Sequence, residues 1–137
     1  MNTTFLTTFM TLMSFKGASQ LAHWNVVGPN FYEYHLLFSR LYETLSGHVD
    51  TMAEQGRGTG IEIPASVFNS VPEVEWQGCQ DLASKLLGLN TAYSAALMML
   101  RDEMERTSNF GFVNVIEGFL TDTNTISYLL RSALDQL

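Results

Sequence analysis

The stretch that decides the fold is residues 23–54, which read HWNVVGPNFYEYHLLFSRLYETLSGHVDTMAE. A helix is predicted to end just before Gly28, which can take the left-handed conformation common at helix C-termini, and Pro29 prevents its continuation. A second helix is predicted to follow Asn30, a suitable N-cap, with Glu33 completing a capping box. The stretch therefore predicts two long helices joined by a short turn.

The second helix carries apolar residues in steps of three and four, which is the spacing of one buried helix face. They are Phe31, Tyr34, Phe38, Leu41, Leu45, Val49 and Met52. His48 lies beside this stripe and is interpreted as an ordinary surface or interface residue. The helix is predicted to end near the glycines at positions 56, 58 and 60.

Helical spacing recurs on both sides of this stretch. A first helix is predicted over about residues 3–26, a third over about residues 82–104 and a fourth over about residues 110–134. Each of them carries a stripe of large apolar side chains, and strand patterns are sparse. The chain is therefore predicted to be all-α.

The segment from about residue 58 to residue 77 contains Pro64 and Pro72 and shows little periodicity. We expect a long connection here, with one short helical turn near residues 65–68. Bundles with one long crossover are a recognised architecture. The predicted fold is a four-helix bundle with a long connection between helices two and three, formed by residues 1–137 as a single domain.

Composition excludes several classes of protein. The chain has 137 residues and a formal charge of −7, which disfavours nonspecific binding to nucleic acids or to anionic membranes. Cys79 is the lone cysteine, so an intrachain disulfide and a paired thiolate metal site are excluded. Apolar residues 5–15 lack the basic region of a signal peptide, and no run approaches the roughly 18 apolar residues of a membrane span. A cytoplasmic location is expected.

Two imidazoles and two carboxylates in residues 23–54 form a ligand set suited to a transition-metal ion: His23, His35, Asp50 and Glu54. Asp50 and Glu54 are four positions apart and share one helix face. His35 and Asp50 are fifteen positions apart on one predicted helix, which separates their backbones by about 22 Å. Either these residues are unrelated and belong to solvated faces, or the site closes between two antiparallel copies of the helix.

The same residues resemble the signature of the Dps proteins, the miniferritins of the ferritin-like superfamily. The matching run is His23-Trp24-Asn25-Val26-x-Gly28-Pro29, then Phe31, His35 and Phe38, and finally Asp50-x-x-Ala53-Glu54. The resemblance implies a ferritin-like four-helix bundle that assembles from two-fold dimers into a hollow, twelve-subunit shell. It also implies that His23 and His35 of one subunit bind iron together with Asp50 and Glu54 of its mate, with Trp24 packed beside the site.

The function implied by this resemblance is that of an iron-binding ferroxidase. Fe(II) would be oxidised by hydrogen peroxide or oxygen at a di-metal site in the dimer interface, and ferric iron (Fe3+) would be stored inside the shell. The sequence departs from the family pattern at Ser39, where Dps proteins usually have an aspartate that helps to hold the second iron. A hydroxyl is a weaker ligand for Fe(II) than a carboxylate.

Two alternatives remain open at this stage. The first is a structural ferritin-like shell protein with weak or lost ferroxidase activity, which Ser39 favours. The second is a DNA-protecting coat protein. Residues 1–15 contain no basic side chain, and the acidic balance would repel the phosphate backbone, so appreciable DNA binding is not expected.

Overall fold

The computed structural model describes residues 2–71, 73 and 78–137. Its elements are the long helices α1 (Asn2–Asn25), α2 (Phe31–Gly58), α3 (Cys79–Arg106) and α4 (Phe110–Ala133), and the short 3-10 helix η1 (Ala65–Ser70). The described residues contain no strand, so the predicted all-α bundle with a long connection between helices two and three is confirmed. Pro72 and residues 74–77 of that connection lie outside the described residues. Within the described residues, no helix is both long enough and apolar enough to cross a membrane.

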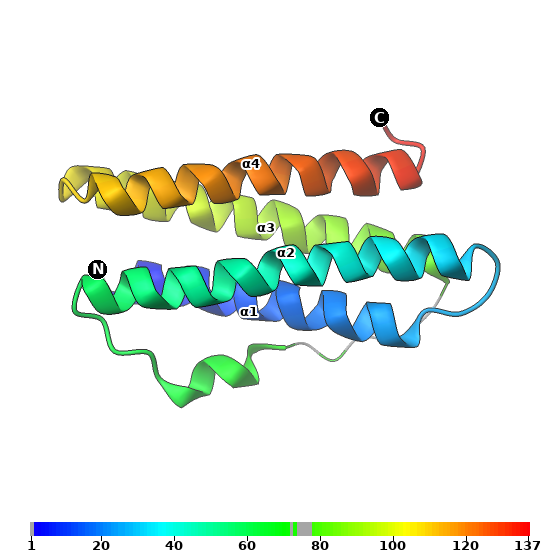
Figure 1. The fold of residues 1–137 in the computed structure, drawn as a ribbon, viewed down its shortest axis with the longest axis horizontal. Helices are drawn as coiled ribbons and strands as arrows, with labels where there is room; N and C mark the ends of the chain where they lie inside the picture. Colours follow the sequence, from blue (N-terminus) through cyan, green and yellow to red (C-terminus); the bar gives the residue numbers. More distant parts are fainter. Residues whose placement is uncertain (1, 72, 74–77) are drawn as a thin grey trace.

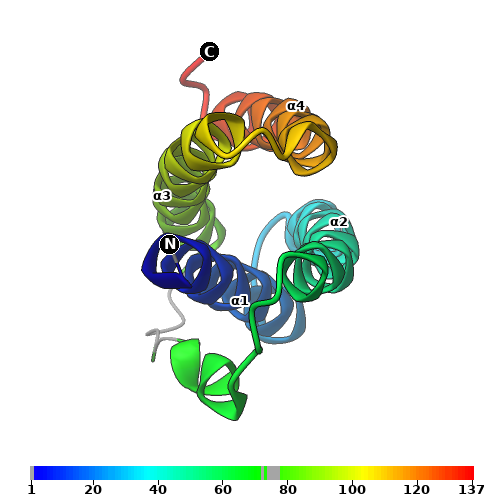
Figure 2. The same ribbon diagram turned by 90° about the vertical axis from the view of Figure 1, so that its left-hand side faces the viewer.

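The four long helices run along a common axis (Figure 1). Short turns make α1 antiparallel to α2 and α3 antiparallel to α4, whereas the long connection returns the chain along the bundle before α3 begins. Consequently α2 and α3 run in the same direction. Viewed from the end, α1 neighbours both α2 and α3, and α3 neighbours α4, while η1 lies outside the bundle against α1 (Figure 2).

Large aromatic side chains from different helices meet in the core. The ring of Phe5 on α1 lies edge-on to Phe112 on α4, with centroids 6.2 Å apart. Phe15 and Tyr93 make a similar contact between α1 and α3, also at 6.2 Å. All four side chains are fully buried. Edge-to-face pairs of this kind add to the stability that burial of apolar area provides.

The turn between α1 and α2 agrees with the prediction in one part and differs in another. Gly28 has φ 97°, the left-handed conformation expected of it. Asn30 directly precedes α2, but it is also left-handed, with φ 64°, and its side chain makes no capping hydrogen bond. The predicted capping box with Glu33 is therefore wrong. Because the backbone at Asn30 is not extended, its side chain is not placed to accept from the first turn of the helix.

The interpretation of His48 as a surface residue is also wrong, because its side chain is buried inside the bundle and only 3% exposed. Its Nδ1 lies 2.9 Å from the Tyr93 hydroxyl, and its Nε2 lies 2.7 Å from Oδ2 of Asp122. Its ring stacks on Phe119, with centroids 3.9 Å apart. A neutral imidazole satisfies this arrangement when Nε2–H donates to the carboxylate and Nδ1 accepts from the phenol. Burial of the polar ring is tolerated because both nitrogens have partners.

Stability should fall in mild acid because of His48. Burial lowers the pKa of His48 below its ordinary value of 6.5, and the hydrogen bond and charge of Asp122 only partly oppose this. As the pH drops below about 6.5, the unfolded chain takes up a proton that the folded protein resists, so the free energy of unfolding decreases. The decrease continues until the pH passes the lowered pKa of the folded state.

Urea unfolding at several pH values between 7.5 and 5, with a metal chelator present, tests this expectation. His48→Gln is the matched variant, since its amide can donate and accept hydrogen bonds but does not titrate. The difference in stability between the wild-type protein and His48→Gln should shrink as the pH falls. A difference that stays constant with pH would contradict the assignment of a neutral, buried imidazole.

Candidate metal site

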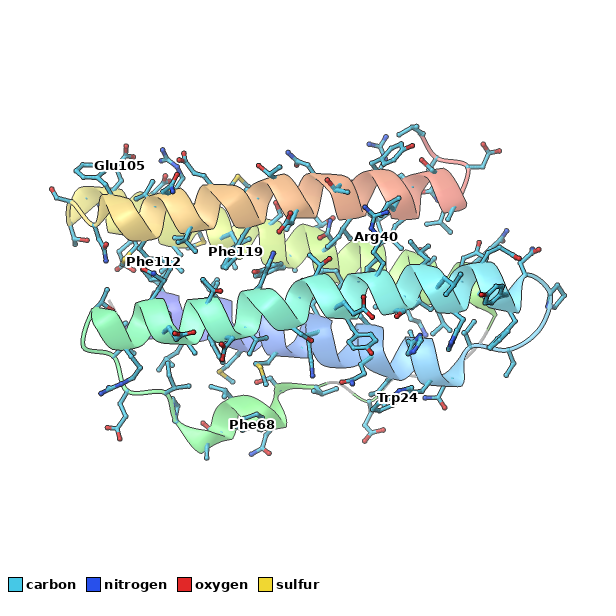
Figure 3. All side chains as sticks on the ribbon, in the orientation of Figure 1. Trp24, Arg40, Phe68, Glu105, Phe112 and Phe119 are labelled. Carbon is cyan, nitrogen blue, oxygen red and sulfur yellow. The ribbon has the colours of Figure 1, made fainter. Side chains whose placement is uncertain are left out.

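The two histidines of the predicted ligand set lie together where the last turn of α1 meets the start of α2. Their rings are stacked, with centroids 4.0 Å apart and an angle of 20° between the planes. Both side chains are partly buried. Trp24 is 63% exposed and marks this end of the bundle (Figure 3). The structure therefore brings His23 and His35 together across the short turn, which agrees with the pairing that the family resemblance implies.

Each histidine is bound to the backbone of the other. Nδ1 of His23 lies 2.9 Å from the carbonyl oxygen of His35, and Nδ1 of His35 lies 2.8 Å from the carbonyl oxygen of His23. A carbonyl oxygen can only accept, so both Nδ1 atoms must carry hydrogen. In the neutral rings, Nε2 is then unprotonated and available on each of them. Histidines that bind metals usually donate their other ring nitrogen to such an acceptor, which sets the tautomer and the ring orientation.

His35 also completes the end of α1. The carbonyl of His23 belongs to the last turn of that helix, where backbone acceptors lack helical partners. Nδ1–H of His35 supplies the missing donor. Aromatic neighbours confine the two rings further: Phe31 stacks on His35 at 5.0 Å, and Tyr42 lies 5.3 Å from His23. The side chain of His35 therefore both caps α1 and is a candidate metal ligand.

The two carboxylates of the predicted set lie elsewhere on the same helix. Asp50 and Glu54 are exposed, and within the described residues neither makes a hydrogen bond or an ion pair. Since α2 is unbroken from Phe31 to Gly58, the distance of about 22 Å between the backbones of His35 and Asp50 holds. Accordingly, no three His, Cys, Asp or Glu side chains gather within the described part of one chain. One chain therefore brings the two histidines together and the two carboxylates together, but it does not bring the histidines to the carboxylates.

One acidic residue near the histidines escaped the sequence analysis. Glu43 lies two helical turns after His35, and Ser39 lies between them at one turn. The hydroxyl of Ser39 donates to Oε1 of Glu43 at 3.3 Å. The signal that could have identified Glu43 is its spacing, because positions 35, 39 and 43 follow one another at steps of four along one side of the helix.

Removal of His35 should destabilise the metal-free protein more than removal of His23. His35→Ala leaves the carbonyl of His23 at the end of α1 without its donor, and we expect a loss of about 1–2 kcal/mol. His23→Ala uncovers the carbonyl of His35, which lies inside α2, where the helix supplies another donor. Urea unfolding of both variants in the presence of chelator gives the comparison. Equal losses, or the reverse order, would show that the ring does not cap α1.

Comparison with known proteins gives the family. Residues 19–137 match the family model of the ferritin-like domain. A "DNA protection during starvation protein" of Brevibacillus brevis is 45% identical over 51 residues, which cover 37% of this chain and 34% of that protein. An "uncharacterized low temperature-induced protein" of Nostoc sp. is 26% identical over 121 residues, which cover 82% of this chain and 68% of that protein.

Solved structures give the same result for the fold. A Dps protein from Bacillus brevis superimposes with a TM-score of 0.87 at 21% identity, covering 97% of this chain and 93% of that one. Dps from Staphylococcus aureus superimposes with a TM-score of 0.85 at 18% identity and the same coverage. The chain therefore belongs to the ferritin-like family, and proteins named Dps are among those that it resembles in sequence and in fold.

Proposed function

We propose that this protein is an iron-binding miniferritin that oxidises Fe(II) with hydrogen peroxide or oxygen and stores the ferric product in a hollow shell. The observation that carries the proposal is the pair of reciprocal hydrogen bonds between His23 and His35. They leave an Nε2 atom available on each of two stacked rings, in a tautomer suited to a metal ion. Membership of the ferritin-like family supports iron as that metal.

The site is completed by a second copy of the chain. Asp50 and Glu54 lie too far along α2 to reach the histidines of their own subunit. In an antiparallel pair of α2 helices, the histidines of each copy lie opposite the carboxylates of the other, and a two-fold axis generates two identical sites. The proposal therefore includes a homo-oligomer, and the complete assembly that we propose is a twelve-subunit shell built from such dimers.

The contribution of the protein to the chemistry is coordination and charge. Neutral imidazoles and anionic carboxylates are suitable ligands for iron, and the negative charge stabilises Fe(III) more than Fe(II). Electron loss from Fe(II) is then less costly at the site than in water. With hydrogen peroxide as the oxidant, two Fe(II) ions each lose one electron, and the peroxide takes up two electrons and two protons to form two water molecules. Asp50 and Glu54 supply the anionic ligands, and His23 and His35 supply the neutral ones.

Hybrid dimers test the shared site. We expect His23→Ala/His35→Ala and Asp50→Ala/Glu54→Ala to abolish Fe(II) binding when each is assembled alone. Each hybrid dimer of the two variants regains one intact site of two, so random co-assembly should restore about a quarter of the wild-type capacity. Anaerobic Fe(II) titration of the co-refolded mixture measures this capacity. Binding no greater than that of the separate variants would rule out a site shared between subunits.

A structural shell protein with weak ferroxidase activity is the second candidate, and Ser39 favours it, since a hydroxyl is a weaker ligand than a carboxylate. Addition of hydrogen peroxide or oxygen to the protein after anaerobic loading with Fe(II) distinguishes this candidate from the main proposal. Under the main proposal, ferric absorbance rises faster than in an equal Fe(II) solution with the His23→Ala/His35→Ala variant. Equal rates in the two samples would mean that the protein binds Fe(II) but does not accelerate its oxidation. A coat protein that binds DNA directly is disfavoured by the net charge of −7.

A further inference from the structure

Glu43 is directed by its place on α2 back toward the helical turn that lies between it and His35. Side chains on a helix lean toward its N-terminus, so the carboxylate of a residue one turn further on is brought back over the preceding turn. The 3.3 Å hydrogen bond from Ser39 to Oε1 of Glu43 shows this lean directly. The carboxylate therefore lies beside the hydroxyl at position 39, which is one turn beyond His35.

The charge of Glu43 is uncompensated within the described part of the chain. Its side chain is exposed, and the hydrogen bond from Ser39 is the one interaction that it makes there. By contrast, Glu105 and Glu117 at the other end of the bundle both pair with Arg101, at 2.9 and 3.0 Å. A cation bound near Ser39 would compensate the negative charge of Glu43, as Arg101 compensates the charges of Glu105 and Glu117.

The register of the proposed dimer brings a second negative charge close to Glu43, which strengthens the argument for a bound cation. If His35 lies opposite the segment between Asp50 and Glu54 of a second copy, the two-fold axis passes α2 near position 43, midway between them. The two Glu43 side chains then start from neighbouring positions on either side of the axis. Like charges at such a distance repel. Turning each carboxylate back toward its own Ser39 and histidine pair reduces the repulsion, and a bound cation would neutralise the charge.

We infer that Glu43 is a metal ligand of this chain, and that it supplies to the second metal position the carboxylate that Ser39 lacks. Ser39 acts as a positioning residue, because its hydroxyl holds the carboxylate over the preceding turn. The anionic oxygen is a stronger ligand for Fe(II) than the hydroxyl itself. This inference rests on the proposed function, since it requires the site formed by the histidine pair and the carboxylates of a second copy.

Anaerobic calorimetric titration with Fe(II) tests the inference on the assembled protein. The wild-type protein should bind about two ions per subunit, as in other two-metal sites. Glu43→Gln should retain the first ion and bind the second at least about tenfold more weakly. Glu33→Gln is the matched control, an exposed glutamate in the first turn of the same helix, and should behave like the wild-type protein. In Ser39→Asp/Glu43→Gln, the new carboxylate should restore the second ion.

Each other result has a distinct meaning. Two ions bound by Glu43→Gln with affinities within about twofold of the wild-type values would overturn the inference. A wild-type protein that binds one ion, which His23→Ala/His35→Ala abolishes, would overturn it as well and leave the proposed function intact. A wild-type protein that binds none would refute the proposed function itself. If Glu43→Gln does not assemble, Glu43→Asp keeps the charge and shortens the reach, and unchanged binding of the second ion would count against Glu43.

Discussion

The unbroken course of α2 from Phe31 to Gly58 is the constraint on which the rest of the structure depends. Its inner face supplies core residues such as Phe38 and Leu45, and its outer face carries Asp50 and Glu54. A straight helix of this length cannot bring its two ends to one ion. Under the proposed function, the bundle therefore presents two half-sites instead of a closed one, and the same rigidity that separates them would keep each in register for a second copy.

The core is not purely apolar, and its polar part links three helices. His48 of α2 lies between Tyr93 of α3 and Asp122 of α4, and burial raises the pKa of Tyr93 well above its usual range. Such a chain of hydrogen bonds specifies position more strictly than apolar contacts, because each donor must meet one acceptor. It connects α2 to α4, on the side of the bundle where these two helices make few other contacts.

Periodicity was sufficient to predict the helices and the long connection, because these follow from local spacing. Periodicity failed where the same spacing was compatible with two different arrangements of the residues. The apolar spacing predicts Val49 on the buried stripe, whereas the bundle buries His48, whose partners come from helices distant in the sequence. Asn30 was predicted to cap α2 by its side chain, but its left-handed backbone prevents this. The position of the Glu43 carboxylate depends on a side-chain rotamer, which no sequence pattern specifies.

The exchange of hydrogen bonds between His23 and His35 has a consequence for the entropy of metal binding at the proposed site. Free histidine side chains lose rotamer freedom when they bind an ion, and the loss opposes binding. Here the stacked rings are already held by two backbone carbonyls, so their ordering is accomplished when the chain folds. The unfavourable entropy is thereby moved from the binding step to the folding step. Binding of an ion by this half of the proposed site would then require little rearrangement beyond the removal of water.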